Sequence, residues 1–553
     1  MDNVTSSGWR QALLQGFVAG LITVSASTIG MVELFGTRYF LAGLFTMGQL
    51  LLFAPPAVLA FSLAGKIKSQ GIGIVTAKAA AIGAVSGAML TLLVWANQTF
   101  PLRTVLINLS PKLMGLLTFD KSLAEGALIL IGVSVATAVF GALLQFVPRL
   151  YRQALLSAII TTLGVGLLAP LLFERIRNFF GQSVAQLVFT SSALQVVPAI
   201  IIFAASAALF YFRGRASLSS KPKAEQNLNP RQKMLRQIPL AIFLLILPML
   251  LGSYLTEITN NVGIFLLMGL GLNIVVGLAG LLDLGYVAFF AIGAYTMAVL
   301  TSTGPLGVAQ MSFWAALPIC VAVSAFAGVL LGTPVLRMRG DYLAIVTLGF
   351  GEIIRILALS DLLKPFIGGA QGILQIPKPS IAGITLISPE QLYYVILGGA
   401  LLAAFISNRL RESRVGRTWI AMREDEDVAE AMGINLVKTK LLAFAIGAGF
   451  SGLAGAIFSP KLTSIFPHSF NLLISINILS LIIVGGLGSI PGTIVGALVL
   501  VGLPELLREF AEFRWLMYGL LLVVMMLNRP EGFIPSDVIR RELHSGDEHR
   551  AEV

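Results

Sequence analysis

The chain has 553 residues, of which 56% are hydrophobic and only 12% are charged, and its formal net charge is +11. A soluble protein of this length carries about twice that share of charge. Apolar stretches of about 18 residues or more recur throughout, so the composition excludes a soluble globular enzyme. The single cysteine, Cys320, excludes an intramolecular disulfide bond. We expect the positive charge to lie in cytoplasmic loops of a membrane protein and not to bind nucleic acid.

The first part of the chain contains six apolar segments, each long enough to cross a bilayer as a helix. Residues 1–10 are polar and lack a following cleavage site of small residues, so we expect the first segment to act as an uncleaved signal. We expect residues 1–212 to form an accessory N-terminal transmembrane domain. Its predicted spans are 12–34, 39–63, 72–96, 123–147, 153–173 and 191–212.

A basic segment, residues 213–237, separates this domain from the rest of the chain. It contains seven Lys and Arg residues against one Glu, together with Pro and Ser, which predicts a solvated cytoplasmic linker. Further spans follow it, which predicts an all-α, polytopic transmembrane helical bundle of about 16 spans. Residues 341–360 and 471–500 contain glycine and charged residues, so a broken or re-entrant helix is an alternative to a continuous span in each of them. The later predicted spans are 238–255, 260–279, 283–300, 312–333, 341–360, 391–407, 441–459, 471–488, 490–508 and 513–528.

The basic residues predict the sidedness of these spans. With the linker in the cytoplasm, the positive-inside rule also places the loops containing Lys66 and Arg149, and the basic segment 409–440, on the inner side. Both termini, including the polar tail 541–553, are then cytoplasmic.

The sequence AMREDEDVAEAMGINLVKTK, residues 421–440, interrupts the apolar spans on the predicted cytoplasmic side. Carboxylates crowd its start, where they favour the positive end of a helix dipole, and Gly433 suits the left-handed residue that ends a helix. A helix over about 423–433 would be marginal in water, so we expect it to dock into a groove on another protein. An ordinary solvated loop helix is the alternative. Its apolar side consists of Val428, Ala431 and Met432.

The second half of the chain resembles one transporter family. The sequence EAMGI, residues 430–434, is similar to the coupling loop of bacterial ABC importer permeases, and residues 238–540 resemble the M-type permease subunit of branched-chain amino acid ABC importers, the LivM family. This resemblance implies an ABC importer permease core in which the charged helix docks into a separate ATPase and transmits its closure to the spans. The matching stretches are 277–300, 336–356, 413–444 and 478–497. The coupling residues that it implies are Arg423, Asp427, Glu430, Ala431 and Gly433.

The resemblance also implies partners and a location. We expect two cytoplasmic ABC ATPase subunits, an H-type permease subunit and an extracytoplasmic solute-binding protein, assembled at the inner membrane of a bacterium. The sequence contains no G-x-x-x-x-G-K-[ST] phosphate loop and no Cys/His metal spacing, so we expect no enzyme activity, cofactor or metal in this chain. ATP is expected to be bound and hydrolysed by the partner subunits.

Residues 1–212 do not resemble the M-type subunit. Within them, residues 156–176 loosely echo residues 343–356 and also resemble a stretch of the H-type permease. Two interpretations stay open: an accessory membrane domain, or a permease-like half that has lost its coupling loop.

Several residues in the second half are candidates for the substrate pathway. Glu352 and Arg355 lie three residues apart in a span, where ionisable groups are costly, so they either pair with each other or face the pathway. Tyr295 either lines the route or packs in the core. Ile367 stands where the family has a threonine. Gly485 and Gly486 either allow close helix packing or expose backbone at a broken helix. Gly368 and Gly369 belong to the sequence FIGGAQGI, residues 366–373, which resembles a Thr-Gly-Gly-x-x-Gly loop of the family and is expected to form a turn with a gating or packing role.

We therefore expect a permease subunit of an ABC importer for branched-chain or other amino acids, or for related small polar solutes. One alternative is an ion-coupled secondary transporter, which requires buried acidic residues. The candidates for that role are Glu33, Glu125, Asp283 and Glu352. A membrane scaffold without transport activity is the other alternative.

Overall fold

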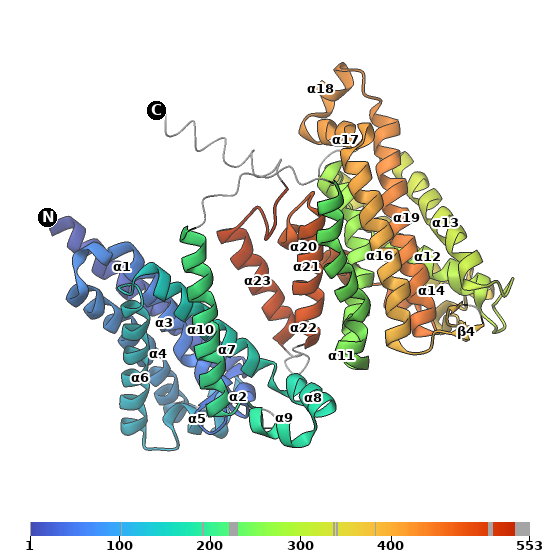
Figure 1. The fold of residues 1–553 in the computed structure, drawn as a ribbon. Coiled ribbons are helices and arrows are strands. Elements are labelled where there is room, and N and C mark those ends of the chain that lie inside the picture. The colour runs from blue at the N-terminus through green and yellow to red at the C-terminus, as the bar shows by residue number, and fades with distance from the viewer. Residues whose placement is uncertain are drawn as a thin grey trace. The chain divides into compact units, whose positions relative to one another are not determined.

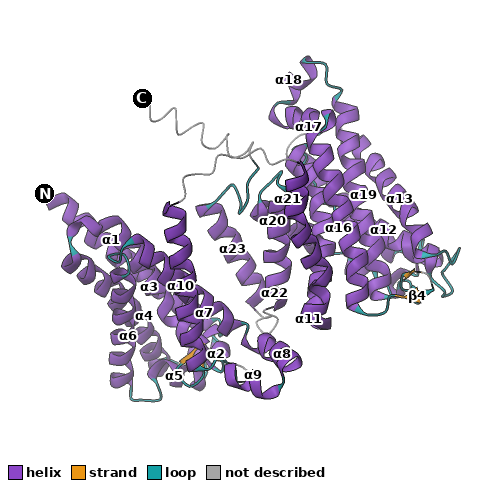
Figure 2. Ribbon diagram, viewed as in Figure 1, coloured by secondary structure: helices purple, strands orange, loops and turns teal. Residues whose placement is uncertain are grey.

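The computed structural model describes residues 2–100, 102–190, 193–219, 230–335, 338, 341–381, 383–506 and 513–536. The chain divides into two compact units, Met1–Asn227 (unit 1) and Leu228–Val553 (unit 2). Helices make up nearly all of the regular structure of the described residues, and the strands among them form two short antiparallel pairs (Figures 1 and 2). The boundary between the units falls inside the predicted linker 213–237, of which residues 220–229 lie outside the described residues.

Unit 1 consists of long apolar helices joined by short helices and one hairpin. The hairpin pairs β1 with β2 and ends at Thr46, whose hydroxyl caps the next helix by accepting from the Gln49 N–H. The elements are α1 (Asp2–Thr28), α2 (Met31–Gly36), β1 (Tyr39–Leu41), β2 (Phe45–Thr46), α3 (Met47–Ile67), η1 (Lys68–Gln70), α4 (Ile72–Thr99), η2 (Leu102–Thr104), α5 (Pro111–Thr118), α6 (Leu123–Leu143), α7 (Arg149–Leu167), α8 (Ala169–Phe180), α9 (Gln182–Val188) and α10 (Val196–Ser219).

Close packing of α4 on α6 forms the centre of unit 1. A methyl group at Gly83 would lie 2.4 Å from the Ser134 carbonyl oxygen, and one at Gly87 would lie 2.7 Å from the Ile131 Cα. These glycines therefore let the two helix backbones touch, as small residues do between membrane helices.

Unit 2 contains the charged segment and most of the candidate site residues. Its elements are α11 (Pro230–Leu272), η3 (Asn273–Leu278), α12 (Val287–Thr301), α13 (Phe313–Val335), α14 (Asp341–Leu359), α15 (Lys364–Ile367), η4 (Gly369–Gln371), β3 (Ser380–Ile381), β4 (Ile384–Thr385), α16 (Pro389–Glu412), α17 (Arg414–Glu424), α18 (Glu426–Ala431), α19 (Leu436–Leu462), η5 (Pro467–Ser469), α20 (Leu472–Gly485), α21 (Ile490–Ala497), η6 (Leu498–Gly502), α22 (Leu503–Leu506) and α23 (Arg514–Asn528).

Helix α19 is the central helix of unit 2, because it packs against α11, α12, α13 and α16. Glycines allow these contacts: a methyl group at Gly455 would lie 2.1 Å from the Phe290 carbonyl oxygen, and one at Gly293 would lie 2.5 Å from the Gly452 Cα. Figure 1 shows α17 and α18 beyond one end of the unit 2 helices, whereas β4 lies near the other end. Helix α19, which follows α18 in the chain, therefore connects the charged segment with the core of unit 2.

The predicted number of spans is not confirmed. By length and composition, 12 helices of the described residues qualify as membrane spans. The predictions 238–255 and 260–279 fall in one such span, Pro239–Leu278, which bends where Gly252 takes the non-helical φ of 62°. Three further predictions correspond to apolar helices that are shorter than a full span: Val287–Thr301, Ile490–Leu506 and Tyr518–Leu527.

One of the two predicted helix interruptions is present. In the region 471–500, α20 ends at Gly485 and α21 begins at Ile490, and the residues between them include Gly486 and Gly488 with φ of 120° and 73°. Residues 341–359, in contrast, form the single helix α14. The first region has glycines that accept left-handed geometry, whereas the charged residues of α14 pair along one helix face.

Candidate coupling site

The charged segment forms two short helices, so the single helix expected over about 423–433 is a wrong prediction. Helix α17 ends at Glu424, and α18 runs from Glu426 to Ala431. Asp425 separates them in an extended conformation, and its carboxylate caps α18 by accepting from the N–H groups of Asp427 and Val428 at 2.9 and 3.0 Å. Asp is a strong N-cap residue, and here this preference starts a new helix within the acidic run.

Helix α17 is anchored to unit 2 by a buried tryptophan. Trp419 is fully buried, and its indole N–H donates to the Thr439 carbonyl oxygen, 2.9 Å away at the start of α19. The Ser413 hydroxyl caps the other end of α17 by accepting from the Gly416 N–H at 3.2 Å. An aromatic ring of this size, packed and hydrogen-bonded, fixes the position of α17 on the bundle.

A second anchor holds the start of α18. The Lys440 ammonium lies 2.8 Å from the Glu426 carboxylate, and the two side chains are only 5% and 20% exposed. Buried ion pairs of this kind are worth little for net stability, but loss of one partner is costly because the other charge is left buried. The pair therefore ties the orientation of α18 to α19.

The other face of α18 is exposed. Four of the predicted coupling residues lie there, namely Asp427, Glu430, Ala431 and Gly433. They surround two exposed apolar side chains, Val428 at 58% and Met432 at 80% exposure. Gly433 has a φ of 88°, and its N–H donates to the Glu430 carbonyl oxygen, which confirms the predicted left-handed helix end.

The fifth predicted coupling residue, Arg423, points into unit 2. Its guanidinium donates to the Gly277 carbonyl oxygen at 2.8 Å, and its side chain is 22% exposed. Gly280, with a φ of 72°, leaves room for the Arg423 side chain. A methyl group at this position would lie only 2.6 Å from the Arg423 Cγ. Gly277 and Gly280 could not be predicted from the sequence, since nothing in their own neighbourhood in the sequence indicates an arginine from 143 residues or more away.

Gly277 belongs to a junction of interrupted helices. It lies in the π-helical segment η3, and the Asn273 side-chain oxygen of the same segment accepts from the Gly488 N–H at 2.7 Å. Gly488 lies in the break between α20 and α21. The C-terminal segment closes over this break, because the Ile534 N–H donates to the Gly485 carbonyl oxygen at 2.9 Å. Arg423 thus connects α17 to two places where a helix departs from regular geometry.

The two candidate pathway glycines at this junction are tightly packed. A methyl group at Gly485 would lie 2.1 Å from the Gly492 carbonyl oxygen, and one at Gly486 would lie 2.5 Å from the Ile534 carbonyl oxygen. Of the two expectations for Gly485 and Gly486, close backbone packing is the one that the structure shows. Gly368 and Gly369 lie elsewhere, in a left-handed turn after α15 with φ of 80° and 57°.

The remaining pathway candidates are spread over unit 2. The Glu352 carboxylate and the Arg355 guanidinium lie 2.8 Å apart. Of the two expectations for these residues, pairing with each other is therefore the one that the structure shows. Tyr295 is 8% exposed and its ring lies 5.6 Å from that of Phe470, while its hydroxyl has no hydrogen-bond partner among the described residues. Asp283 is fully buried, and one of its oxygens accepts from the Gly285 N–H at 2.9 Å.

The four acidic residues considered for an ion-coupled carrier are divided between the two units. Glu33 and Glu125 belong to unit 1, and Glu33 accepts from the Ser110 hydroxyl at 2.5 Å, whereas Asp283 and Glu352 belong to unit 2. The described residues contain no group of three or more His, Cys, Asp or Glu side chains that could hold a metal ion.

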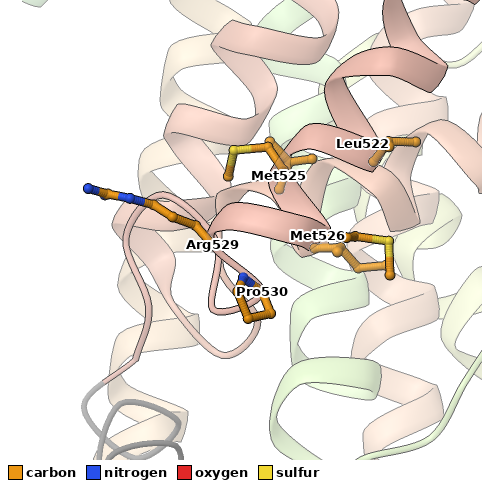
Figure 3. Close-up of a pocket in the computed structure, with 7 residues that line it drawn as sticks. Leu522, Met525, Met526, Arg529 and Pro530 are labelled. Atoms are coloured by element: carbon orange, nitrogen blue, oxygen red, sulfur yellow. The ribbon is translucent and has the colours of Figure 1, made fainter. Parts of the chain in front are cut away.

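A small pocket lies between α20 and α23 (Figure 3). Its lining consists of Ile483, Val484, Leu522, Met525, Met526, Arg529 and Pro530. Figure 3 shows the Arg529 side chain directed away from Met526 and Leu522. The lining is apolar apart from this arginine, so it offers no matched pair of charges to a polar solute.

Comparison with known proteins gives a consistent family. The model of the family "Branched-chain amino acid transport system / permease component" matches residues 254–528. The chain is similar to the high-affinity branched-chain amino acid transport system permease protein LivM of Escherichia coli, with 38% identity over 62% of this chain and 87% of that protein. It is also similar to LivM of Salmonella typhimurium, with 42% identity over 54% of this chain and 74% of that protein.

A weaker likeness reaches a second type of permease. The chain is 25% identical to the LivH permease protein of Escherichia coli over 51% of its own length and 95% of that protein. No solved structure matches the chain. The likeness covers 74% and 87% of the two LivM proteins, and the family match lies inside unit 2. This chain therefore belongs to the family of branched-chain amino acid transport system permease components.

Proposed function

We propose that this chain is the M-type permease subunit of an ABC importer for branched-chain amino acids or related small polar solutes. Its relatives carry that name, and its many apolar helices agree with an integral protein of the inner membrane of a bacterium. The likeness to LivH supports an H-type permease as the second membrane subunit. Two cytoplasmic ATPases would hydrolyse ATP, and an extracytoplasmic binding protein would deliver the solute. The chain's own part is to provide the membrane passage.

The exposed face of α18 carries this proposal. A helix of 6 residues does not hold its shape alone, and α18 is fixed from behind by Asp425 and by the Glu426–Lys440 pair. Its exposed side combines apolar Val428 and Met432 with acidic side chains. Such a face fits a groove of mixed apolar and basic character on an ATPase, with apolar anchors in the groove and carboxylates at its rim.

Movement of α18 would reach the membrane helices through Arg423. Trp419 fixes α17 on α19. We therefore expect a displacement of α18 to move α17 as a rigid body. The guanidinium would then displace the Gly277 carbonyl and, through Asn273, the break at Gly488. π-helical turns are frequent at functional sites, and interrupted helices commonly form the substrate sites of transporters. These elements are therefore where we expect the alternating-access change to act.

In this proposal α17, α18 and both termini face the cytoplasm, in agreement with the positive-inside rule. Unit 1 lies outside the family match, which begins at residue 254. We propose that it is an accessory membrane domain and that a separate H-type permease engages the second ATPase.

The test is uptake of radiolabelled L-leucine by proteoliposomes that contain the complex, the binding protein and ATP. Uptake that requires internal ATP and co-purification of an ATPase support the proposal. Glu430→Lys should then abolish uptake and ATPase recovery together, because it reverses a charge on the docking face. Asp361→Lys is the matched control, since Asp361 is 98% exposed and lies on the loop between α14 and α15. Uptake driven by an ion gradient without ATP would contradict the proposal and favour the secondary transporter.

A further inference from the structure

Two cations of unit 1 converge on one neutral residue. Gln145 lies between α6 and α7, and its carbonyl oxygen accepts from the Lys68 ammonium at 2.7 Å and from the Arg152 guanidinium at 3.3 Å. Lys68 directly follows α3, and Arg152 lies in the first turn of α7. Because both groups bond to a single oxygen atom, two positive charges lie within two hydrogen-bond lengths of each other, where they repel.

The position of Gln145 is fixed by contacts with α3. Its side-chain N–H donates to the Phe61 carbonyl oxygen at 3.1 Å, and its side-chain oxygen accepts from the Arg152 guanidinium. Gly65 leaves room for this side chain, because a methyl group there would lie 3.1 Å from the Gln145 side-chain nitrogen. The convergence of the two cations is therefore built into the packing of α3, α6 and α7.

The two charges are not neutralised within the described part of the chain. No carboxylate of the described side chains lies within 4.0 Å of Lys68 or Arg152. A third cation nearby, Lys78 of α4, is 1% exposed and donates to the side-chain oxygen of Gln70 at 2.7 Å, two residues after Lys68. Cations that are buried or crowded without a counter-charge are costly, which favours the binding of an anion beside them.

Both converging cations keep donors for such an anion. Lysine and arginine each carry several N–H donors. Lys68 makes a single hydrogen bond, and Arg152 donates through Nη1 alone, so among the described residues no partner is found for the Arg152 Nε and Nη2. These two nitrogens form a planar fork that matches two oxygens of a phosphate. The arrangement therefore fits a phosphate group.

The cluster lies at the level of a membrane interface. Lys68 and Arg152 fall in the terminal turns of two candidate membrane spans. With the linker in the cytoplasm, both helix ends are on the inner side. Tyr151, next to Arg152, stacks on Tyr211 with 5.3 Å between the ring centres. Tyrosine is enriched where the headgroups of a bilayer begin, so the two cations are at headgroup level.

Apolar side chains lie at the same end of α6. Phe140 and Leu143 precede Gln145 and are 58% and 38% exposed. The Phe146 ring borders the site as well, because its centre lies 5.7 Å from the Lys68 ammonium. A ligand that joins a phosphate to hydrocarbon chains can use both kinds of surface, whereas a free phosphate compound would use only the cations.

We propose that Lys68 and Arg152 bind the phosphate of an anionic phospholipid of the inner leaflet, and that Gln145 positions the two cations. The phosphate accepts from the Arg152 fork and from the Lys68 ammonium, and the acyl chains lie against Phe140 and Leu143. The negative surface of the inner leaflet attracts basic pockets between membrane helices. This inference goes beyond the proposed function, because it gives unit 1 a lipid partner and does not depend on the imported solute.

Native mass spectrometry of the full-length chain in detergent, titrated with phosphatidylglycerol, tests the site. The wild type should bind phosphatidylglycerol about 10-fold more tightly than phosphatidylcholine, and glycerol 3-phosphate should not compete. Lys68→Gln/Arg152→Gln should weaken phosphatidylglycerol binding by about 10-fold or more, as expected for loss of charged hydrogen bonds. The matched control is Lys112→Gln/Lys121→Gln, which removes the same charge from two exposed residues elsewhere in unit 1 and should retain binding within about threefold.

Gln145→Glu tests the positioning role. The new carboxylate would lie beside both cations and take the place of the lipid phosphate. This variant should unfold at a higher temperature than the wild type in lipid-free detergent, and it should bind phosphatidylglycerol about 10-fold more weakly. A residue with a purely structural role would not change stability and lipid binding in opposite directions.

A phosphatidylglycerol with a photoreactive group in its acyl chain gives a readout that needs no variant. Its crosslinks to the wild type should lie within residues 140–152. Crosslinks confined to other segments, equal binding of phosphatidylglycerol and phosphatidylcholine, or equal losses in the two double variants would overturn the proposal. Glycerol 3-phosphate bound as tightly as the lipid would also overturn it, because the cluster would then bind a free phosphate compound.

Discussion

Replacement of Arg423 by methionine isolates the link between the coupling helices and the membrane helices. Met has a similar length and packs well in a helix, but it cannot donate to the Gly277 carbonyl oxygen, which lies 2.8 Å from the guanidinium. The lost bond has a charged donor and is mostly shielded from water, as the side chain is 22% exposed. Hydrogen bonds of that kind contribute about 1.5–3 kcal/mol, which is about 10- to 100-fold in an equilibrium constant.

The consequence should appear in coupling and not in assembly. Trp419 and the Glu426–Lys440 pair still hold α17 and α18 in place. ATP hydrolysis by the complex should continue, whereas leucine imported per ATP hydrolysed should fall by about fivefold or more, the usual range for loss of a coupling free energy of this size. Both rates are measured in the same proteoliposomes.

Arg417→Met is the matched control for this variant. Arg417 lies on the same helix but is exposed, and its guanidinium donates to the Glu412 carbonyl oxygen at 3.0 Å within the segment. Its replacement should leave the ratio of import to hydrolysis unchanged. If Arg423→Met also leaves that ratio unchanged, or if both variants lower it equally, the reasoning about the Gly277 link is refuted.

Three further predictions concern the anchors of the coupling helices. Gly433→Val should uncouple import, because a β-branched residue at φ 88° costs about 1–3 kcal/mol and shifts the exit from α18; import and ATPase recovery report it, and Gly433→Asn, which tolerates this φ, should be milder. Trp419→Ala should lower the free energy of unfolding by about 3–5 kcal/mol through the cavity and the lost bond to Thr439; thermal unfolding in detergent measures this, and an unchanged midpoint would contradict it. Glu426→Gln should cost about 3 kcal/mol by leaving Lys440 buried without its counter-charge; the double variant Glu426→Gln/Lys440→Met should recover much of that loss, and a further loss instead would refute the pairing.

Local signals in the sequence were sufficient for several parts of this architecture. Gly433 ends α18 in the predicted left-handed conformation, because that requirement belongs to a single residue. The interruption in 471–500 was also visible, since Gly485, Gly486 and Gly488 lie close together in the sequence. The acidic run predicts a helix but does not indicate its division at Asp425, because four neighbouring carboxylates compete for the same capping position.

Contacts between distant residues could not be predicted. The Arg423–Gly277 bond and the Glu257–Lys461 pair join residues separated by 146 and 204 positions, so no local pattern indicates them. The predicted span count is not confirmed for a related reason. Hydropathy measures how apolar a segment is, but a bend such as that at Gly252, or a helix too short to cross alone, depends on packing against neighbouring helices.

The central claim is that α18 meets an ATPase in the cytoplasm, and site-specific crosslinking tests it most directly. A photoreactive amino acid at Val428, which is 58% exposed on α18, should crosslink to the ATPase subunit in intact membranes. The same amino acid at Val308, which is 77% exposed in the loop between α12 and α13, should not. A crosslink to the ATPase from position 308 but not from 428, or labelling of position 428 by a membrane-impermeant reagent from outside the cell, would contradict the account.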